Sequence, residues 1–212
     1  MPSMDRVDVT EAPAAEPAAQ MTHREVMEAL SGLLLAMFVA MLSSTVVTNA
    51  LPVIITDLDG TQTGYTWVVV ANLLSMTATT PIWGKLADLF SKKLLVQSAL
   101  VIYSVGSLLA AFAQNMETLI GARVIQGLGV GGLTALVQVV IATMVTPRER
   151  GRYSGYIGAT FALATVSGPL IGGLIVDSPL GWRGCFFVGL PIAAVAFRVL
   201  QAKLHLPLVR RP

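Results

Sequence analysis

The sequence has few charged residues. Only 12% of its 212 residues are Asp, Glu, Lys or Arg, whereas a soluble domain of this size carries about a quarter. Hydrophobic residues make up 54% of the chain, and the mean hydropathy is +0.72. This balance excludes an ordinary soluble domain and predicts a polytopic protein in a lipid bilayer.

Residues that carry enzyme chemistry are also scarce. The single cysteine, Cys185, rules out an intrachain disulfide, and nothing near it has metal-ligand spacing. The two histidines, His23 and His205, lie at opposite ends of the apolar region, and no nucleophile has a base at useful spacing. We therefore expect no enzyme, no cofactor and no metal site. Nucleic-acid binding is also disfavoured, because the basic residues are spread over several loops rather than gathered in one patch.

Long apolar runs dominate the chain. About twenty residues of helix cross the roughly 30 Å of bilayer hydrocarbon, and we expect six such spans. Residues 1–28 are interpreted as a disordered cytoplasmic tail with a short surface helix, residues 29–204 as the six-span bundle, and residues 205–212 as the start of a basic cytoplasmic loop. The expected spans are about 29–55, 63–83, 94–113, 119–145, 153–176 and 184–204.

The basic residues predict the orientation. Two loops and their flanks carry six of them, whereas the alternate loops 56–62 and 114–118 carry none. By the positive-inside rule both termini are cytoplasmic, which requires an even number of spans and predicts a multi-pass protein of the cell membrane. Arg183, on the outer side, is the exception. The six loop residues are Lys85, Lys92, Lys93, Arg148, Arg150 and Arg152.

The fourth apolar run carries an arginine near its start. A charge at this depth costs a few kcal/mol on insertion scales, so Arg123 is a candidate functional residue. Gln126 and Gly127 lie three and four positions further on, and all three therefore share one helix face. The alternative is a snorkelling arginine that reaches the headgroups from the helix end.

Three strings resemble motifs of the major facilitator superfamily. They are "GKLADLFSKK" (84–93), "LIGARVIQGLGVGG" (119–132) and "ATVSGPLIGG" (164–173). The resemblance covers the chain from about residue 29 onward. It implies an all-α polytopic membrane protein whose six transmembrane helices form two inverted three-helix repeats, that is, one of the superfamily's two bundles.

The first two strings imply coupling and gating roles. In the family the span-four arginine, here Arg123, is implicated in proton coupling, and the loop residues Gly84, Asp88, Lys92 and Lys93 are associated with gating. We expect Gly84 to permit close backbone approach, and Asp88 to cap a helix or pair with basic residues. Lys92 replaces the family's arginine and loses its planar fork. The alternatives are an ordinary charged loop and simple glycine packing.

The third string resembles a motif associated with drug-exporting antiporters. Gly168, Pro169, Gly172 and Gly173 match it, while Ala164 stands where the first glycine would be. A proline among small residues predicts a kinked, closely packed span. The alternative is a packing kink without a transport role.

Two further strings, "LSSTVVTNALP" (42–52) and "GWRGCFFVGLP" (181–191), resemble the fourteen-span drug:proton antiporters of the QacA/EmrB type. Ser43 occupies the family's aspartate position, and serine cannot carry a proton near neutral pH. No carboxylate lies inside an expected span, so no proton carrier is visible. The candidate polar residues of a substrate cavity are Ser43, Thr45, Asn72, Gln126 and Gln138.

The sequence thus predicts a transporter, with proton-coupled export of apolar or cationic drug-like compounds by alternating access. The chain resembles only half of a family member. We therefore expect a missing second six-span half or a partner chain to complete it. The alternative is a truncated, non-transporting six-span fragment or a partner-dependent membrane subunit.

Overall fold

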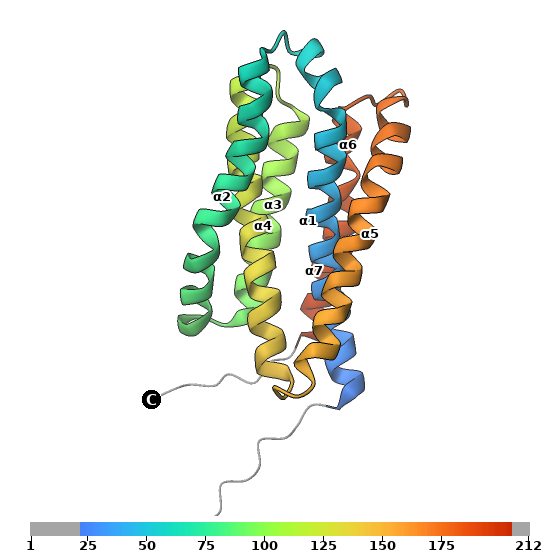
Figure 1. Cartoon of the computed structure of the whole chain (residues 1–212). Coiled ribbons are helices and arrows are strands. Elements are labelled where there is room, and N and C mark those ends of the chain that lie inside the picture. The colour runs from blue at the N-terminus through green and yellow to red at the C-terminus, as the bar shows by residue number, and fades with distance from the viewer. Residues whose placement is uncertain (1–21, 205–212) are drawn as a thin grey trace, which may run out of the picture.

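A computed structural model describes residues 22–204, and within this range all regular secondary structure is helical, with no strand (Figure 1). The expected tail and the expected basic loop fall largely outside the described residues. The all-α fold class is confirmed. The helices are α1 (His23–Asp57), α2 (Gln62–Leu89), α3 (Lys92–Ala111), α4 (Met116–Met144), α5 (Arg150–Val176), α6 (Arg183–Phe187) and α7 (Gly189–Lys203).

Five segments of the described chain are long and apolar enough to cross a membrane: α1, α3, α4, α5 and the run Arg183–Lys203, with mean hydropathies of 1.8 to 2.1. α2 falls outside this set, although it has 28 residues, because hydroxyl and amide side chains interrupt its apolar sequence. It nevertheless packs along α4 as a full-length member of the bundle (Figure 1). The expected span at 63–83 therefore rests on the place of α2 in the fold rather than on its hydropathy.

The outer face of α5 exposes large apolar side chains. A soluble monomer rarely shows such a continuous apolar surface, so this face supports a membrane setting. The exposed fractions are 53% for Phe161, 62% for Leu163, 67% for Val166, 68% for Leu170 and 76% for Leu174.

α1 begins earlier than expected. The expected surface helix and the first span form one continuous helix that starts at His23. A capping box fixes this start, because Thr22 Oγ1 accepts a hydrogen bond from the Glu25 amide while the Glu25 carboxylate accepts one from the Thr22 amide at 2.8 Å.

α2 ends later than expected, so most of the string 84–93 is helix rather than loop. Only Phe90 and Ser91 separate α2 from α3, and the Ser91 hydroxyl caps α3 by accepting a hydrogen bond from the Leu94 amide at 3.2 Å. Asp88 is exposed and has no recorded hydrogen bond or ion pair within residues 22–204. The expectation that Asp88 caps a helix or pairs with a basic residue is not met among these residues and stays a prediction.

The sixth expected span is divided at Val188 into α6 and α7. Pro191 lacks an amide hydrogen and cannot complete the helical bond to the Phe187 carbonyl, which accounts for the interruption. Arg183 at the start of α6 donates from Nη1 to the carbonyls of Ala111 and Ala113 at 2.6 and 2.8 Å. Because these carbonyls lie at or just beyond the end of α3 and lack helical partners, this basic residue has a structural reason to lie at this end of the bundle.

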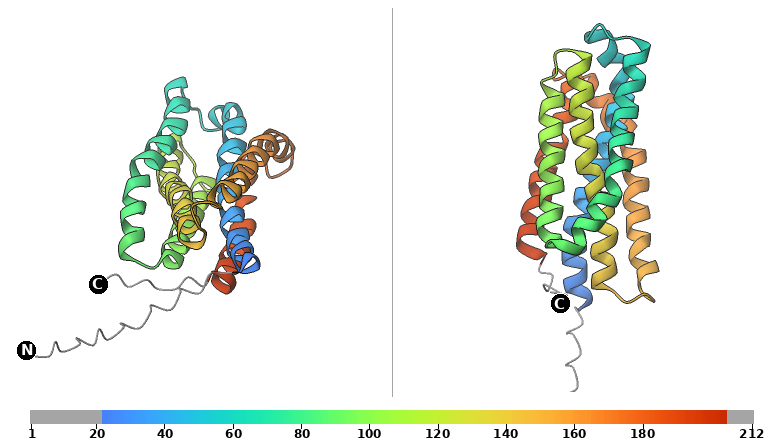
Figure 2. Two further views of the ribbon diagram at one scale, coloured as in Figure 1. Left: turned by 60° about the horizontal axis from the view of Figure 1, so that its bottom comes forward. Right: turned by 90° about the vertical axis from the view of Figure 1, so that its left-hand side faces the viewer.

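The helices form two groups around α1 and α4. α5 and α7 both pack on α1, while α2 and α3 both pack on α4 (Figures 1 and 2). His23 and Lys203, the ends of the helical region, lie at the same end of the bundle, which we call the termini end (Figure 1). An even number of crossings produces this arrangement.

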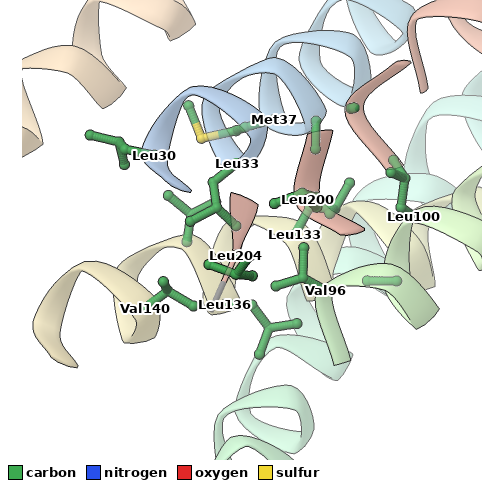
Figure 3. Close-up of a cluster of buried hydrophobic side chains, with 14 of the residues drawn as sticks. Leu30, Leu33, Met37, Val96, Leu100, Leu133, Leu136, Val140, Leu200 and Leu204 are labelled. Carbon is green, nitrogen blue, oxygen red and sulfur yellow. The ribbon is translucent and has the colours of Figure 1, made fainter. Parts of the chain in front are cut away.

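Two buried apolar clusters fill the bundle. One occupies the termini end and includes Leu33, Leu133 and Leu200 from α1, α4 and α7 (Figure 3). The other occupies the far end and includes Leu51 and Phe186. Buried polar residues on α1, α3 and α4 lie between the stretches that contribute to the two clusters.

Candidate functional site

Arg123 lies inside the bundle and is only 2% exposed. Its Nη1 donates to Gln126 Oε1 at 2.7 Å, and its Nε donates to the Val68 carbonyl of α2 at 3.4 Å. α4 places Arg123 and Gln126 on one face because they are three residues apart. The guanidinium therefore points into the bundle, and the snorkelling interpretation is not supported.

Gln126 extends the contact to two more helices. Its Nε2 lies within hydrogen-bonding distance of Ser107 Oγ on α3 at 2.9 Å and of Ser43 Oγ on α1 at 3.2 Å. Both serines are at most 1% exposed. We call Arg123, Gln126, Ser43 and Ser107 the Arg123 network. The sequence prediction included all of these residues except Ser107.

Ser107 could have been found from its neighbour. A Cβ added at Gly106 would lie 2.5 Å from the Gln126 amide nitrogen, so only glycine allows α3 to come this close to α4. A serine next to a glycine in an apolar span is a weak signal of such a contact. The sequence alone does not show which helix packs against Ser107.

The network is made of one permanent cation and neutral dipoles. Within residues 22–204 the recorded ion pairs involve only Glu28, so no described carboxylate lies within 4.0 Å of the guanidinium. A buried cation held only by carbonyl, amide and hydroxyl groups costs free energy relative to an apolar side chain of similar size. Arginine cannot lose its proton at physiological pH, so the network supplies a fixed charge rather than a proton carrier.

Asn72 adds a buried acceptor on α2. The side chain is 2% exposed, and its Oδ1 has no hydrogen-bond partner within the described residues. Asn72 follows Val68 by one helical turn, on the side of α2 that meets α4, since a Cβ added at Gly127 would lie 2.6 Å from the Asn72 carbonyl. An unsatisfied buried acceptor costs about 1–3 kcal/mol, which makes Asn72 a candidate for binding an absent donor.

The third predicted group lies where α5 crosses α1. A Cβ added at Gly168 would overlap Thr45 Oγ1, and one added at Gly172 would lie 3.4 Å from the Val46 carbonyl. The Thr45 hydroxyl donates within its own helix, to the Leu42 carbonyl at 2.9 Å, and lies 3.3 Å from the Ala164 carbonyl. Pro169 is the residue after Gly168 in α5.

Gly173 was expected in the same contact but points elsewhere. No atom of the described chain lies within 4 Å of a Cβ added there. The next position after Gly172 is rotated by about 100° around the helix, which carries Gly173 away from α1.

The remaining predicted residues do not join the Arg123 network. Gly84 was expected to meet another backbone closely, but no described atom lies within 4 Å of a Cβ added there. Gln138 is exposed on α4, about 22 Å along the helix from Arg123. Lys93 instead binds α7, because its Nζ donates to the Gln201 carbonyl at 2.6 Å. Lys92 is half-buried at the start of α3.

Several apolar helices that enclose a buried arginine network, with small-residue crossings between them, define a bundle of the kind found in helical membrane transporters. The comparison with known families identifies which kind. The chain belongs to the Major Facilitator Superfamily, whose profile matches residues 33–210.

Curated relatives include efflux pumps. The chain is 44% identical over 189 residues to the efflux pump dotC of Dothistroma septosporum, covering 88% of this chain and 32% of that protein. It is 41% identical over 167 residues to the multidrug transporter protein MdtP of Bacillus subtilis, covering 79% of this chain and 30% of that protein. The chain thus spans about a third of the length of these relatives.

Solved structures share the fold. A bacterial homologue of the human lysosomal transporter Spinster, in an inward-facing and unoccupied conformation, matches with a TM-score of 0.70 and 18% identity. The match covers 87% of this chain and 43% of that one. The fold is therefore that of part of a major facilitator transporter.

Proposed function

We propose that the chain forms the amino-terminal six-span half of a proton-coupled exporter of the fourteen-span, QacA/EmrB-type branch. A second six-span half or a partner chain completes the transporter, and the two bundles rock to expose a shared cavity alternately. The similarity to the efflux pump dotC and to the multidrug transporter MdtP supports export, and the strings at 42–52 and 164–173 support this branch. In this proposal both termini are cytoplasmic, and the six spans form two inverted three-helix repeats.

The observation that carries this proposal is the Arg123 network. A permanent charge is held in the bundle by residues of α1, α3 and α4 together with a carbonyl of α2. Such a charge lowers the pKa of any carboxyl group brought near it and so favours proton release there. Because Ser43 replaces the family's aspartate, we place the proton-carrying carboxylate in the second half.

The charge of the network also bears on the substrate. We propose that Ser43, Thr45, Asn72 and Gln126 contribute polar groups to the cavity when the bundles rock. Since this half supplies a fixed cation, it suits apolar drug-like compounds better than cationic ones. Export of a cation would require acidic side chains from the second half.

The exposed surface at the termini end has a separate proposed role. No described atom lies within 4 Å of a Cβ added at Gly84, Asp88 is exposed on the same helix α2, and Lys92 lies at the start of the neighbouring α3. We propose that they form the gating contact with the second bundle, where Gly84 would permit the close approach that it does not make here.

An efflux assay tests the proposal. The chain is expressed in drug-sensitive cells alone, and also fused to the second half of a matching relative such as MdtP. We expect proton-gradient-dependent export of an apolar dye only from the fusion, and loss of that export in Arg123→Ala but not in Arg152→Ala, a control at an exposed position. Equal export by the chain alone and by the fusion would reject the half-transporter proposal.

A second candidate is a non-transporting six-span fragment or a partner-dependent subunit. The same assay separates the two, because a fragment of this kind would leave the fusion inactive although both halves insert in the membrane.

A further inference from the structure

A groove of about 340 Å³ lies between α1 and α7 at the termini end. Glu28 and Ser31 of α1 line one side, and the opposite side is formed by Arg198, Val199, Ala202 and Lys203 of α7. α5 and α7 both pack on α1 but make no contact with each other.

The groove has an uncompensated positive charge. Two basic side chains and one carboxylate line it, and the carboxylate of Glu28 is already paired with Lys203 and with Arg24, each at 3.1 Å. Arg198 is exposed and has no recorded hydrogen bond or ion pair within residues 22–204. A guanidinium in this position can bind a phosphate through two parallel hydrogen bonds.

The depth of Arg198 fits a lipid headgroup. Arg198 precedes the end of α7 at Lys203 by five residues, or about 7 Å along the helix axis, and its long side chain can reach back toward the end of the bundle. Val195, one turn deeper on α7, is 53% exposed. The surface therefore passes from an apolar residue to a cation and then to the polar helix end, in the order of a phospholipid's acyl chain, phosphate and headgroup.

We propose that this groove binds the phosphate of an anionic phospholipid, with Arg198 as the main ligand and the acyl chain lying along Val195. Charge complementarity selects a net anionic headgroup, because the zwitterionic headgroup of phosphatidylcholine would leave the excess positive charge uncompensated. The apolar side chains beside Arg198 favour a lipid over free phosphate. The groove at Ser31 lies about 21 Å along α1 from Thr45 of the α1–α5 crossing, and it does not depend on which compound the protein transports.

Native mass spectrometry of the purified 212-residue chain tests the site. The delipidated protein is incubated in detergent with phosphatidylglycerol or with phosphatidylcholine, and the bound lipid is counted. We expect preferential retention of phosphatidylglycerol and a roughly fivefold weaker retention in Arg198→Gln, the effect of one basic residue near an anionic surface. Arg198→Lys should keep most of the binding. Arg152→Gln is the matched control, since Arg152 is also exposed at the termini end and should have no effect.

Three results would overturn the proposal. Equal retention of the two lipids by the wild type, or equal loss in Arg198→Gln and Arg152→Gln, would mean that no specific site exists. Displacement of phosphatidylglycerol by millimolar inorganic phosphate would identify a free-anion site instead. The wild-type comparison between lipids stays informative even if Arg198→Gln folds poorly, and protection of the buried thiol of Cys185 reports whether it has folded.

Discussion

The bundle holds charge in two very different settings. At its centre Arg123 is almost completely buried and bonded only to neutral groups, whereas at the termini end Arg24, Glu28 and Lys203 form exposed ion pairs. Water already solvates the exposed pairs, so breaking one changes stability little. Arg123 is removed from bulk water inside the bundle, so the carbonyl oxygens of Gln126 and Val68 must replace part of the solvation that the guanidinium loses. A single buried charge therefore constrains the helices around it more strongly than the exposed pairs do.

The largest effect on stability should come from a substitution that disturbs the close packing of the helices around Arg123. α3 and α4 approach so closely that a Cβ added at Gly129 would lie 2.5 Å from the Tyr103 amide nitrogen and 2.6 Å from the Ala99 carbonyl. Gly129→Val should force the two backbones apart and destabilise the bundle by about 3 kcal/mol. The unfolding midpoint in detergent, followed by the reaction of Cys185 with a thiol-specific dye, measures this change.

Gly121→Val is the matched control for this variant. Gly121 is on the same helix, and no described atom lies within 4 Å of a Cβ added there. Its midpoint should shift far less than that of Gly129→Val. Equal shifts would show that the loss comes from β-branching in a helix rather than from the α3–α4 contact.

A second, smaller effect on stability distinguishes the charge of Arg123 from the polar groups that solvate it. Gln126→Leu removes the acceptor of Arg123 Nη1 and also the partner of Ser43 and Ser107. We therefore expect the free energy of unfolding to fall by about 1–2 kcal/mol. Arg123→Met removes the cation itself and should be close to neutral for stability. The double variant should be more stable than Gln126→Leu alone.

The double-mutant cycle measures this coupling directly. The four proteins are compared by the unfolding midpoint in one detergent. If the two substitutions are simply additive, Gln126 does not act through Arg123, and the network would be a set of independent contacts. Export by the fusion described above should be lost in Arg123→Met despite its normal stability.

The helical fold and the Arg123 network differ in how far the sequence predicts them. The spans follow from apolar length, and Arg123 and Gln126 follow from helical spacing and the family motif. The roles of Ser107 and Asn72 depend on which helices pack together. The periodicity of one sequence does not specify that pairing. The start of α1 and the end of α2 were missed because polar segments at the termini end continue a helix as readily as they end one.

The glycines of the family motifs show the same limit. Gly84 and Gly173 match family motifs, yet no described atom lies near a Cβ at either position. Gly168 and Gly172 belong to the same motif as Gly173, and they do make their contact with α1. A motif therefore predicts that a small residue is present, whereas only the three-dimensional arrangement shows which neighbour it serves.

The smallest effect concerns the exposed ion pairs. The hydrogen bond from Lys203 and then that from Arg24 lower the pKa of Glu28 below its ordinary value. A lowered carboxyl pKa contributes stability at pH values above the ordinary pKa of glutamate, and this contribution is lost as the pH falls through the pKa of the folded protein. The unfolding midpoint of the wild type should therefore decrease slightly more on acidification than that of Glu28→Gln. Measuring both proteins from about pH 6 to about pH 3 tests this, and high salt should reduce the difference. A larger acid dependence in Glu28→Gln would contradict the assigned pairing, and it would remove the contrast between the exposed charges and Arg123.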